Sequence, residues 1–290
     1  MAQAIANNIR IEYDTFGDSH SPALLLIMGG GSQMIYWEEE FCQLLVDKGF
    51  HVIRFDNRDV GLSTKFDEAG VPDIMAAMEG EPIVPPYSLE DMADDAVGLL
   101  DALGIEKAHV CGASVGGMIA QVVSYRNPER VLSLTSIMAS TGNPDLPKIR
   151  DEILAEVYKP VPSGREAYIA HYVNMWRKLW SPGFPFEEKR VEKLMGESFD
   201  RSYSPQGLAR QGMAVVTHGY QKASIASIKA PTLVIHGDKD PFMPLEGGKE
   251  IAQLIPGTKL LIIEGMGHDM PKETWPTIVD AIAGHVRTAP

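Results

Sequence analysis

The sequence predicts an α/β fold, in which a mostly parallel central sheet is flanked by helices and carries an all-helical cap insertion. Apolar strand-like runs alternate with segments of helical periodicity over residues 1–140 and again over residues 220–290. Several runs are continuously apolar, as expected for strands that are buried on both faces of a parallel sheet. Residues 141–219 are broken by prolines and lack a convincing strand, so we expect a helical cap between two parts of one core domain.

Composition limits the classes of partner. The chain has 290 residues, enough for one large α/β domain with an insertion. Its formal charge of −13, without a basic cluster, argues against nucleic acid or a membrane and favours a small-molecule ligand. Cys42 and Cys111 fall in a predicted helix and a predicted strand and match neither a disulfide framework nor a metal site. We expect no cofactor or metal, and a monomer or homodimer.

The expected elements follow from local patterns. Residues 1–8 lack the basic and apolar parts of a signal peptide, which predicts a cytoplasmic protein. We interpret residues 56–63 as an architectural polar loop and residues 64–87 as an exposed excursion. The expected strands are residues 9–16, 23–28, 50–55, 108–111, 131–138, 231–236 and 259–263. The expected core helices are residues 35–48, 89–103, 115–126 and a closing helix that ends near residue 286.

A nucleophile is predicted where the apolar run 108–111 gives way to Gly112, Ser114 and Gly116 and then to a helix. A serine hydroxyl is a poor nucleophile by itself and needs a sharp strand-to-helix turn at which a base can reach it. The flanking glycines carry no side chain that would collide at such a turn. The motif also fits a glycine-rich junction with an incidental serine, so the rest of the chain decides between the two interpretations.

Backbone N–H donors are expected on two sides of Ser114. The helix that begins at Val115 directs its free N–H groups toward the place where an oxyanion would form. The cluster Gly29 to Gly31 follows a buried strand directly, which lets backbone N–H groups approach a ligand closely. In a parallel sheet both groups would lie beyond the carboxyl ends of strands, where ligands bind.

His268 is the histidine that we expect to act as a base. It lies in a loop after a predicted strand and follows both Ser114 and a candidate acid, an order typical of nucleophile-elbow hydrolases. The acid is Asp240 or Asp238, both in the loop after the strand 231–236. We choose Asp240, because it lies further beyond the strand end and a following proline can fix its turn. Asp238 is better placed to bind turn amides.

The cap is rich in aromatic and methionine side chains, which would either line an apolar pocket or form the core of the cap itself. The first interpretation predicts a mostly apolar substrate. The cap residues in question are Tyr172, Met175, Trp176, Trp180, Phe184, Phe186 and Met213. The residues that we expect to contact the substrate are Met34, Trp176, Trp180 and Met213.

Together these motifs resemble the α/β-hydrolase superfamily over about residues 9–140 and 230–290. The matching pieces are residues 26–30, 51–56 with Arg58, Gly61 and Ser63, 112–116, 236–240 and 265–268. Within the superfamily, the Met-Gly-Gly, Arg-Phe-Asp-Asn-Arg-Asp and Gly-Met-Gly-His segments are most similar to the methyl esterases that act on polyketide antibiotics of the aclacinomycin type.

The resemblance implies a cofactor-independent carboxylic ester hydrolase that acts through an acyl-enzyme. The implied roles are nucleophile for Ser114, acid for Asp240, base for His268, and oxyanion hole for the N–H groups of Gly30 and Val115. Many relatives carry His-Gly where this chain has Met-Gly, and the cap matches no known motif, so the substrate stays open. Carbon–carbon bond hydrolysis, lactonase action and perhydrolysis use the same three groups, and a receptor on this fold would bind without turnover.

Overall fold

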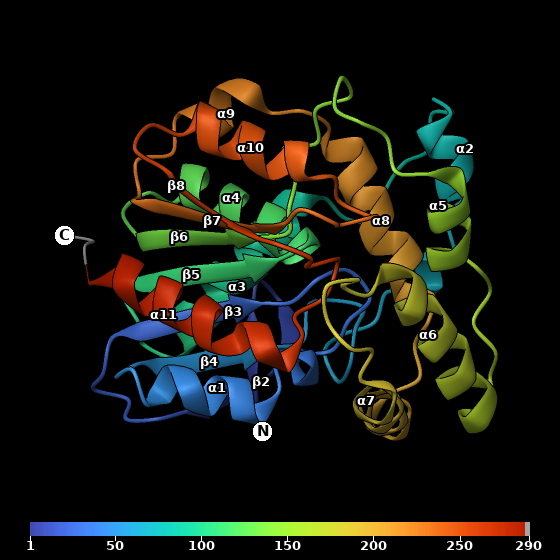
Figure 1. The fold of residues 1–290 in the computed structure, drawn as a ribbon, viewed down its shortest axis with the longest axis horizontal. Coiled ribbons are helices and arrows are strands. Elements are labelled where there is room, and N and C mark those ends of the chain that lie inside the picture. Colours follow the sequence, from blue (N-terminus) through green and yellow to red (C-terminus); the bar gives the residue numbers. More distant parts are fainter. Residues whose placement is uncertain (288–290) are drawn as a thin grey trace.

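The computed structural model describes residues 1–287 and contains an eight-stranded sheet (Figure 1). The strand order is β1-β2-β4-β3-β5-β6-β7-β8, with β3 to β8 parallel and the pairs β1-β2 and β2-β4 antiparallel. The strands are β1 Ala2–Ala6, β2 Ile9–Phe16, β3 Ala23–Ile27, β4 His51–Phe55, β5 Ala108–Ala113, β6 Val131–Ile137, β7 Thr232–Gly237 and β8 Lys259–Ile263. The predicted α/β fold with a mostly parallel sheet is confirmed.

The N-terminal strand β1 is absent from the sequence prediction. It pairs with β2 through a turn at Asn7 and Asn8, whose φ angles are 48° and 63°. Asparagine tolerates this left-handed region better than most residues, and two such positions in succession suit the tight turn of an antiparallel hairpin. The segment is short and mostly alanine, and its one β-branched residue, Ile5, is exposed, so it lacks the composition from which strands are predicted.

Helices cover both faces of the sheet (Figure 1). Phe41 of α1 and Trp275 of α11 belong to the buried cluster on one face, and Leu99 of α3 and Ile119 of α4 belong to the cluster on the other. Strands β3, β4, β5 and β7 are buried along their whole length, which explains why their sequences are mostly apolar. The core helices are α1 Glu39–Val46, α3 Leu89–Ala102, α4 Val115–Arg126, α9 Lys222–Ala226, α10 Leu245–Leu254 and α11 Trp275–Val286.

The insertion between β6 and β7 forms a layer of helices beside the carboxyl ends of the strands (Figure 1). Its helices are α5 Asp151–Val157, α6 Arg165–Leu179, α7 Glu188–Arg201 and α8 Gly207–His218. Helix α2 (Ile74–Met78), within the excursion after β4, packs against α8, and its Ile74 is buried. Part of the excursion is therefore covered by the cap. Within residues 1–287, no helix combines the length and apolar character needed to cross a membrane.

Buried ion pairs join the cap to the loop after β4. Arg210 of α8 donates from Nε and Nη2 to the two carboxylate oxygens of Asp59 at 2.9 and 2.8 Å, and the two side chains are 1% and 0% exposed. Arg201, at the end of α7, lies 2.6 Å from Asp56. A buried carboxylate without a cationic partner would be strongly destabilising, so these acids and the cap arginines depend on one another. The polar loop thus attaches the cap to the core.

Candidate active site

Ser114 lies at the sharp turn between β5 and α4, with a φ of 55° and a ψ of −124°. A residue with a side chain rarely adopts this conformation, so the surrounding structure must hold it there. The chain is tightly packed at the turn. A Cβ atom on Gly112 would lie 2.0 Å from the carbonyl oxygen of Gly116, and one on Gly116 would lie 2.1 Å from that of Ile27. The turn that presents Ser114 therefore requires both glycines.

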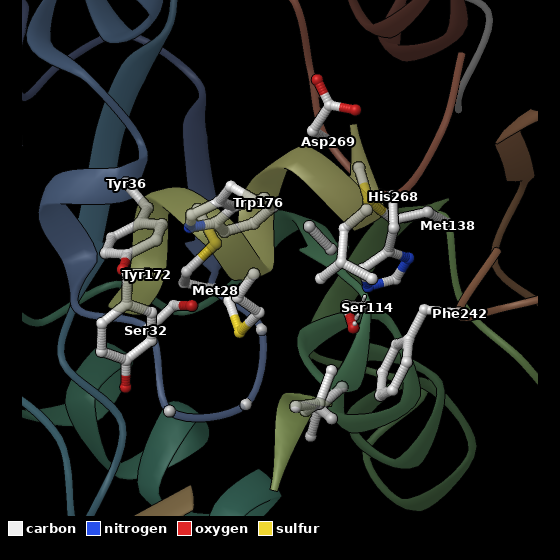
Figure 2. Close-up of a pocket in the computed structure, with 18 of the residues that line it drawn as sticks. Met28, Ser32, Tyr36, Ser114, Met138, Tyr172, Trp176, Phe242, His268 and Asp269 are labelled. Carbon is white, nitrogen blue, oxygen red and sulfur yellow. Dashed lines mark hydrogen bonds between the residues drawn. The ribbon is translucent and has the colours of Figure 1, made fainter. Parts of the chain in front are cut away.

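A hydrogen-bonded chain joins Ser114, His268 and Asp240. Ser114 Oγ lies 3.0 Å from His268 Nε2 (Figure 2), and His268 Nδ1 lies 2.8 Å from Asp240 Oδ2. In the tautomer that donates from Nδ1 to the carboxylate, Nε2 accepts the serine hydroxyl. The side chains come from the carboxyl ends of β5, β7 and β8, and each residue is at most 9% exposed. The arrangement can move a proton away from Ser114.

The two acids after β7 have different partners. Asp240 Oδ1 accepts two backbone N–H groups of its own turn at 2.9 and 2.8 Å, while Oδ2 faces His268. Asp238 Oδ1 accepts the N–H of Gly265 at 2.6 Å and so bridges two loops. The geometry favours Asp240 as the acid that orients the imidazole.

Backbone donors lie beside Ser114 as well. Within residues 1–287, the N–H groups of Gly30 and Val115 have no hydrogen-bond acceptor. A Cβ atom on Gly30 would lie 3.2 Å from Cγ2 of Val115, and one on Gly29 would lie 3.1 Å from the Cβ of Ser114. The glycine loop therefore packs directly against the turn of the candidate nucleophile, where an oxyanion could receive both donors.

Ser114 and His268 open onto a cavity of about 160 Å³ at the boundary of core and cap. Figure 2 shows Tyr36 and Tyr172 on one side of Ser114 and Phe242 on the other. The ring of Phe242 meets the imidazole of His268 nearly edge-on, with 5.0 Å between centroids. The lining side chains include Met28, Tyr36, Met138, Tyr172, Met175, Trp176, Trp180, Met195 and Phe242. Such a wall suits a mostly apolar ligand.

Of the four residues expected to contact the substrate, Trp176 and Trp180 line the cavity, whereas Met34 and Met213 do not. Met34 begins the 3-10 helix η1 (Met34–Tyr36), its N–H donates to Asp56, and its side chain is fully buried. Met213 is also fully buried; its neighbour on α8, at position 212, lines the cavity instead, because successive helical residues point about 100° apart. The prediction for these two methionines is corrected, since both belong to the packed interior.

Several lining residues escape the sequence patterns, among them Met28, Tyr36, Met138 and Phe242. They lie in loops and short turns at strand ends, where the backbone and not a period of 2 or 3.6 residues sets the direction of a side chain. Their positions in the sequence, next to predicted site residues, could have indicated that they line the cavity. Met28 directly precedes the glycine cluster, and Phe242 lies two residues after Asp240.

The cap also holds the loop that carries His268. The N–H of His268 donates to Leu179 O at 2.9 Å, and that of Gly267 donates to Ser181 Oγ at 2.7 Å. Ser181 donates in turn to Oδ1 of Asp269 at 2.6 Å. Burial raises the pKa of Asp269 to about 7, although the hydrogen bonds from Ser181 lower it. A buried titratable carboxyl thus follows His268 in the chain and ties its loop to the cap.

The fold and the site together define the class of this protein. It belongs to the α/β hydrolase fold family, which matches residues 22–273. The chain is similar to the rhodomycin D methylesterase DauP of Streptomyces sp. (strain C5), with 30% identity over 94% of this chain and 93% of that protein. The resemblance to methyl esterases predicted from the motifs is therefore confirmed.

Two further relatives show how far the similarity extends. The 3-oxoadipate enol-lactonase 2 of Acinetobacter baylyi is 27% identical over 89% of this chain and 86% of that protein. Among solved structures, the enol-lactonase from Burkholderia xenovorans LB400 has a TM-score of 0.76 and 21% identity, with 99% of this chain and 100% of that chain covered. The structural match shows the same fold. The family and the methylesterase relative support a hydrolase that acts on esters.

Proposed function

We propose that this protein is a serine carboxylic ester hydrolase that works through a covalent acyl-enzyme. The observation that carries the proposal is the hydrogen-bonded chain from Ser114 through His268 to Asp240, next to an apolar cavity. A serine hydroxyl becomes a useful nucleophile when a hydrogen-bonded base can take its proton and an acid holds that base in place. The similarity to a methylesterase supports an ester as the substrate.

The reaction proceeds in two halves. Ser114 Oγ attacks the carbonyl carbon of the ester, and its proton passes to Nε2 of His268 while Asp240 holds the imidazole. The N–H groups of Gly30 and Val115 stabilise the oxyanion that forms. The bond to the alcohol oxygen then breaks, and His268 gives that oxygen its proton. Water attacks the acyl-enzyme by the same route and releases the acid.

The cavity fits a small to medium apolar ester, such as a methyl ester. Its volume of about 160 Å³ lies below the roughly 300–1,000 Å³ typical of sites for drug-sized ligands. Glu38 and Arg190 contribute charge to the wall, but they pair with each other at 2.6 Å. A compensated pair does not call for a charged substrate, so the apolar side chains dominate selection.

The Ser114→Ala substitution tests the covalent mechanism. We expect ester hydrolysis to fall by about 10⁴-fold or more, because the bond-forming oxygen is removed. The affinity for the product acid and the melting temperature should change little, since the side chain loses a single atom. The assay is a panel of esters in which acyl length and alcohol bulk vary separately, and mass spectrometry checks that a phosphonate ester labels the wild-type protein at Ser114. Full activity in the alanine variant would exclude the acyl-enzyme.

A lactone is the second candidate substrate, because the chain is similar to an enol-lactonase over most of its length. The same three side chains would open the ring, with the leaving alcohol still attached to the acyl group. Adding γ-lactones of matched size to the ester panel distinguishes the two. A kcat/KM for a lactone well above that for every open-chain ester would favour lactonase action.

A further inference from the structure

Gln211 of the cap helix α8 reaches two loops of the core at once. Its Oε1 accepts the backbone N–H of Gly31 at 2.7 Å, and its Nε2 donates to the carbonyl oxygen of Arg58 at 2.7 Å. The side chain is completely buried and does not line the cavity. An amide that faces a donor on one side and an acceptor on the other can bind in a single orientation, so the geometry of this side chain is fixed.

The glycine loop that Gln211 holds, residues 29–32, has little to fix it internally. It contains three glycines in succession, and Gly31 has a φ of 68°, a conformation that favours glycine. The loop makes one turn bond with itself, from the N–H of Ser32 to the carbonyl oxygen of Gly29 at 3.2 Å. A sequence with this much conformational freedom needs contacts from outside to keep one shape.

The bond to Gly31 acts directly on the candidate oxyanion donor. The N–H groups of Gly30 and Gly31 belong to successive peptide planes, which only the two torsions of Gly30 connect. Fixing the plane that carries the N–H of Gly31 therefore limits where the N–H of Gly30 can point. Asn57 holds the start of the segment by donating to the carbonyl oxygen of Met28 at 2.9 Å. Gln211 holds its far end.

The preceding residue keeps Gln211 in place. Arg210 binds both oxygens of Asp59 at 2.9 and 2.8 Å, and its Nη1 donates to the carbonyl oxygen of Gly70 at 2.9 Å. These bonds fix the first turns of α8 against the core. The side-chain amide of Gln211 therefore extends from a helix that is held rigidly against the core. A group that orients a loop needs such a fixed position.

We propose that Gln211 is a positioning residue that holds the glycine loop in the orientation in which the N–H of Gly30 can bind an oxyanion. This inference rests on the proposed function, because the oxyanion forms only if Ser114 attacks a carbonyl group. Gln211 is not part of the cavity wall, so its loss leaves the contacts with the bound substrate in place. Without Gln211, the N–H of Gly30 would stabilise the oxyanion of the transition state less well. This lowers kcat and leaves KM nearly unchanged.

Three variants separate this role from a general structural one. Gln211→Met keeps the length and apolar stem of the side chain but loses both hydrogen bonds, whereas Gln211→Glu keeps an acceptor for the N–H of Gly31. Gln206→Met makes the same exchange at an exposed glutamine just before α8. We expect kcat to fall about tenfold in Gln211→Met, less than the roughly 10²–10³-fold that removal of a whole oxyanion donor costs. KM should stay within about twofold. Gln211→Glu should lose less, and Gln206→Met should match the wild type.

The inhibition constant of a trifluoromethyl ketone analogue of the best ester provides a second measurement. A variant that only loosened the fold would not weaken this inhibitor more than it weakens the product acid. Ser114 Oγ adds to the carbonyl carbon of the ketone and gives up its proton to His268, which leaves an oxyanion in the site. We expect the inhibition constant to rise about as much as kcat falls in Gln211→Met. The dissociation constant of the product acid should change less than about twofold.

The outcomes are distinct. If Gln211→Met keeps the wild-type kcat and inhibitor affinity, the inference is overturned, while an active wild type and an inactive Ser114→Ala variant leave the proposed function standing. Equal losses of kcat, inhibitor affinity, product affinity and melting temperature in both Gln211 variants would also overturn it, because they indicate a loosened fold. Absence of ester hydrolysis by the wild-type protein would remove the proposed function and the inference with it.

Discussion

Asp240 and Asp238 lie two residues apart in one loop, and their hydrogen bonds predict opposite results for the same substitution. Asp240→Asn should lower turnover by about 10⁴-fold, as the equivalent change does in the protease triad, because an amide does not hold the required tautomer of His268. Asp238→Asn should leave turnover near wild type and lower stability by about 1 kcal/mol or less, since an amide oxygen can still accept the N–H of Gly265. Steady-state kinetics and thermal melting of both variants decide between the two carboxylates. Collapse of turnover in Asp238→Asn alone would reverse the assignment.

Individual site residues differ in how far the sequence alone could identify them. Ser114, Asp240 and His268 each follow an apolar run, and parallel strands bring such positions to one edge of the sheet. The structure places the three in hydrogen-bond contact. Met34 was misplaced because nothing local indicates that the chain turns into η1 and buries that side chain. Gln211 is a lone polar residue on a cap helix, and its partners lie 153 and 180 positions away in the chain.

At the level of elements, the contact between the cap segment after α6 and the loop of His268 should make stability depend on pH. Burial raises the pKa of Asp269 from its ordinary 3.8 to about 7, so the folded protein keeps a proton that the unfolded chain releases. Its contribution to stability is therefore complete below about pH 4 and is lost as pH rises through 7. The rise in pKa corresponds to roughly 4 kcal/mol.

The Asp269→Asn variant isolates this effect. Its amide is neutral at every pH and its Oδ1 can still accept the Ser181 hydroxyl. We expect the two proteins to melt at similar temperatures near pH 4 and the variant to melt higher at pH 8. Melting curves at several pH values between these limits provide the measurement. Parallel curves would mean that the carboxyl ionises in the folded state with an ordinary pKa.

Elements of the core were more predictable than those of the cap. Strands β3 to β7 are largely buried and rich in apolar residues, and β8 keeps an apolar run although most of it is exposed. All six were therefore recognisable from residue type. Strand β1 was not, since it is short and mostly alanine and its pairing depends on the turn at Asn7 and Asn8. In the cap, helices could be expected from the absence of strands, but their contacts with the core depend on distant partners such as Asp59 and Arg210.

For the molecule as a whole, replacing residues 145–215 with a short linker should cost turnover as well as selectivity. The apolar cap side chains predict a changed ranking of esters. The hydrogen bonds of Ser181 and Gln211 to core loops add a general loss, which we expect to be at least tenfold for every ester tested. Values of kcat/KM across the ester panel measure both effects. Trp176→Phe serves as the control, because it alters the cavity and leaves those bonds intact. A truncated protein with wild-type turnover on small esters would show that the cap only selects substrates.

The Arg210–Asp59 pair has a consequence for recombination between relatives. A cap without an arginine at the position of Arg210 would leave Asp59 buried without its cationic partner. We expect such a chimera to lose about 3–5 kcal/mol of stability, the usual cost of removing one partner of a buried ion pair. An exchange between relatives should therefore replace the cap together with residues 56–63. These two segments are separate in the sequence, but their side chains depend on one another.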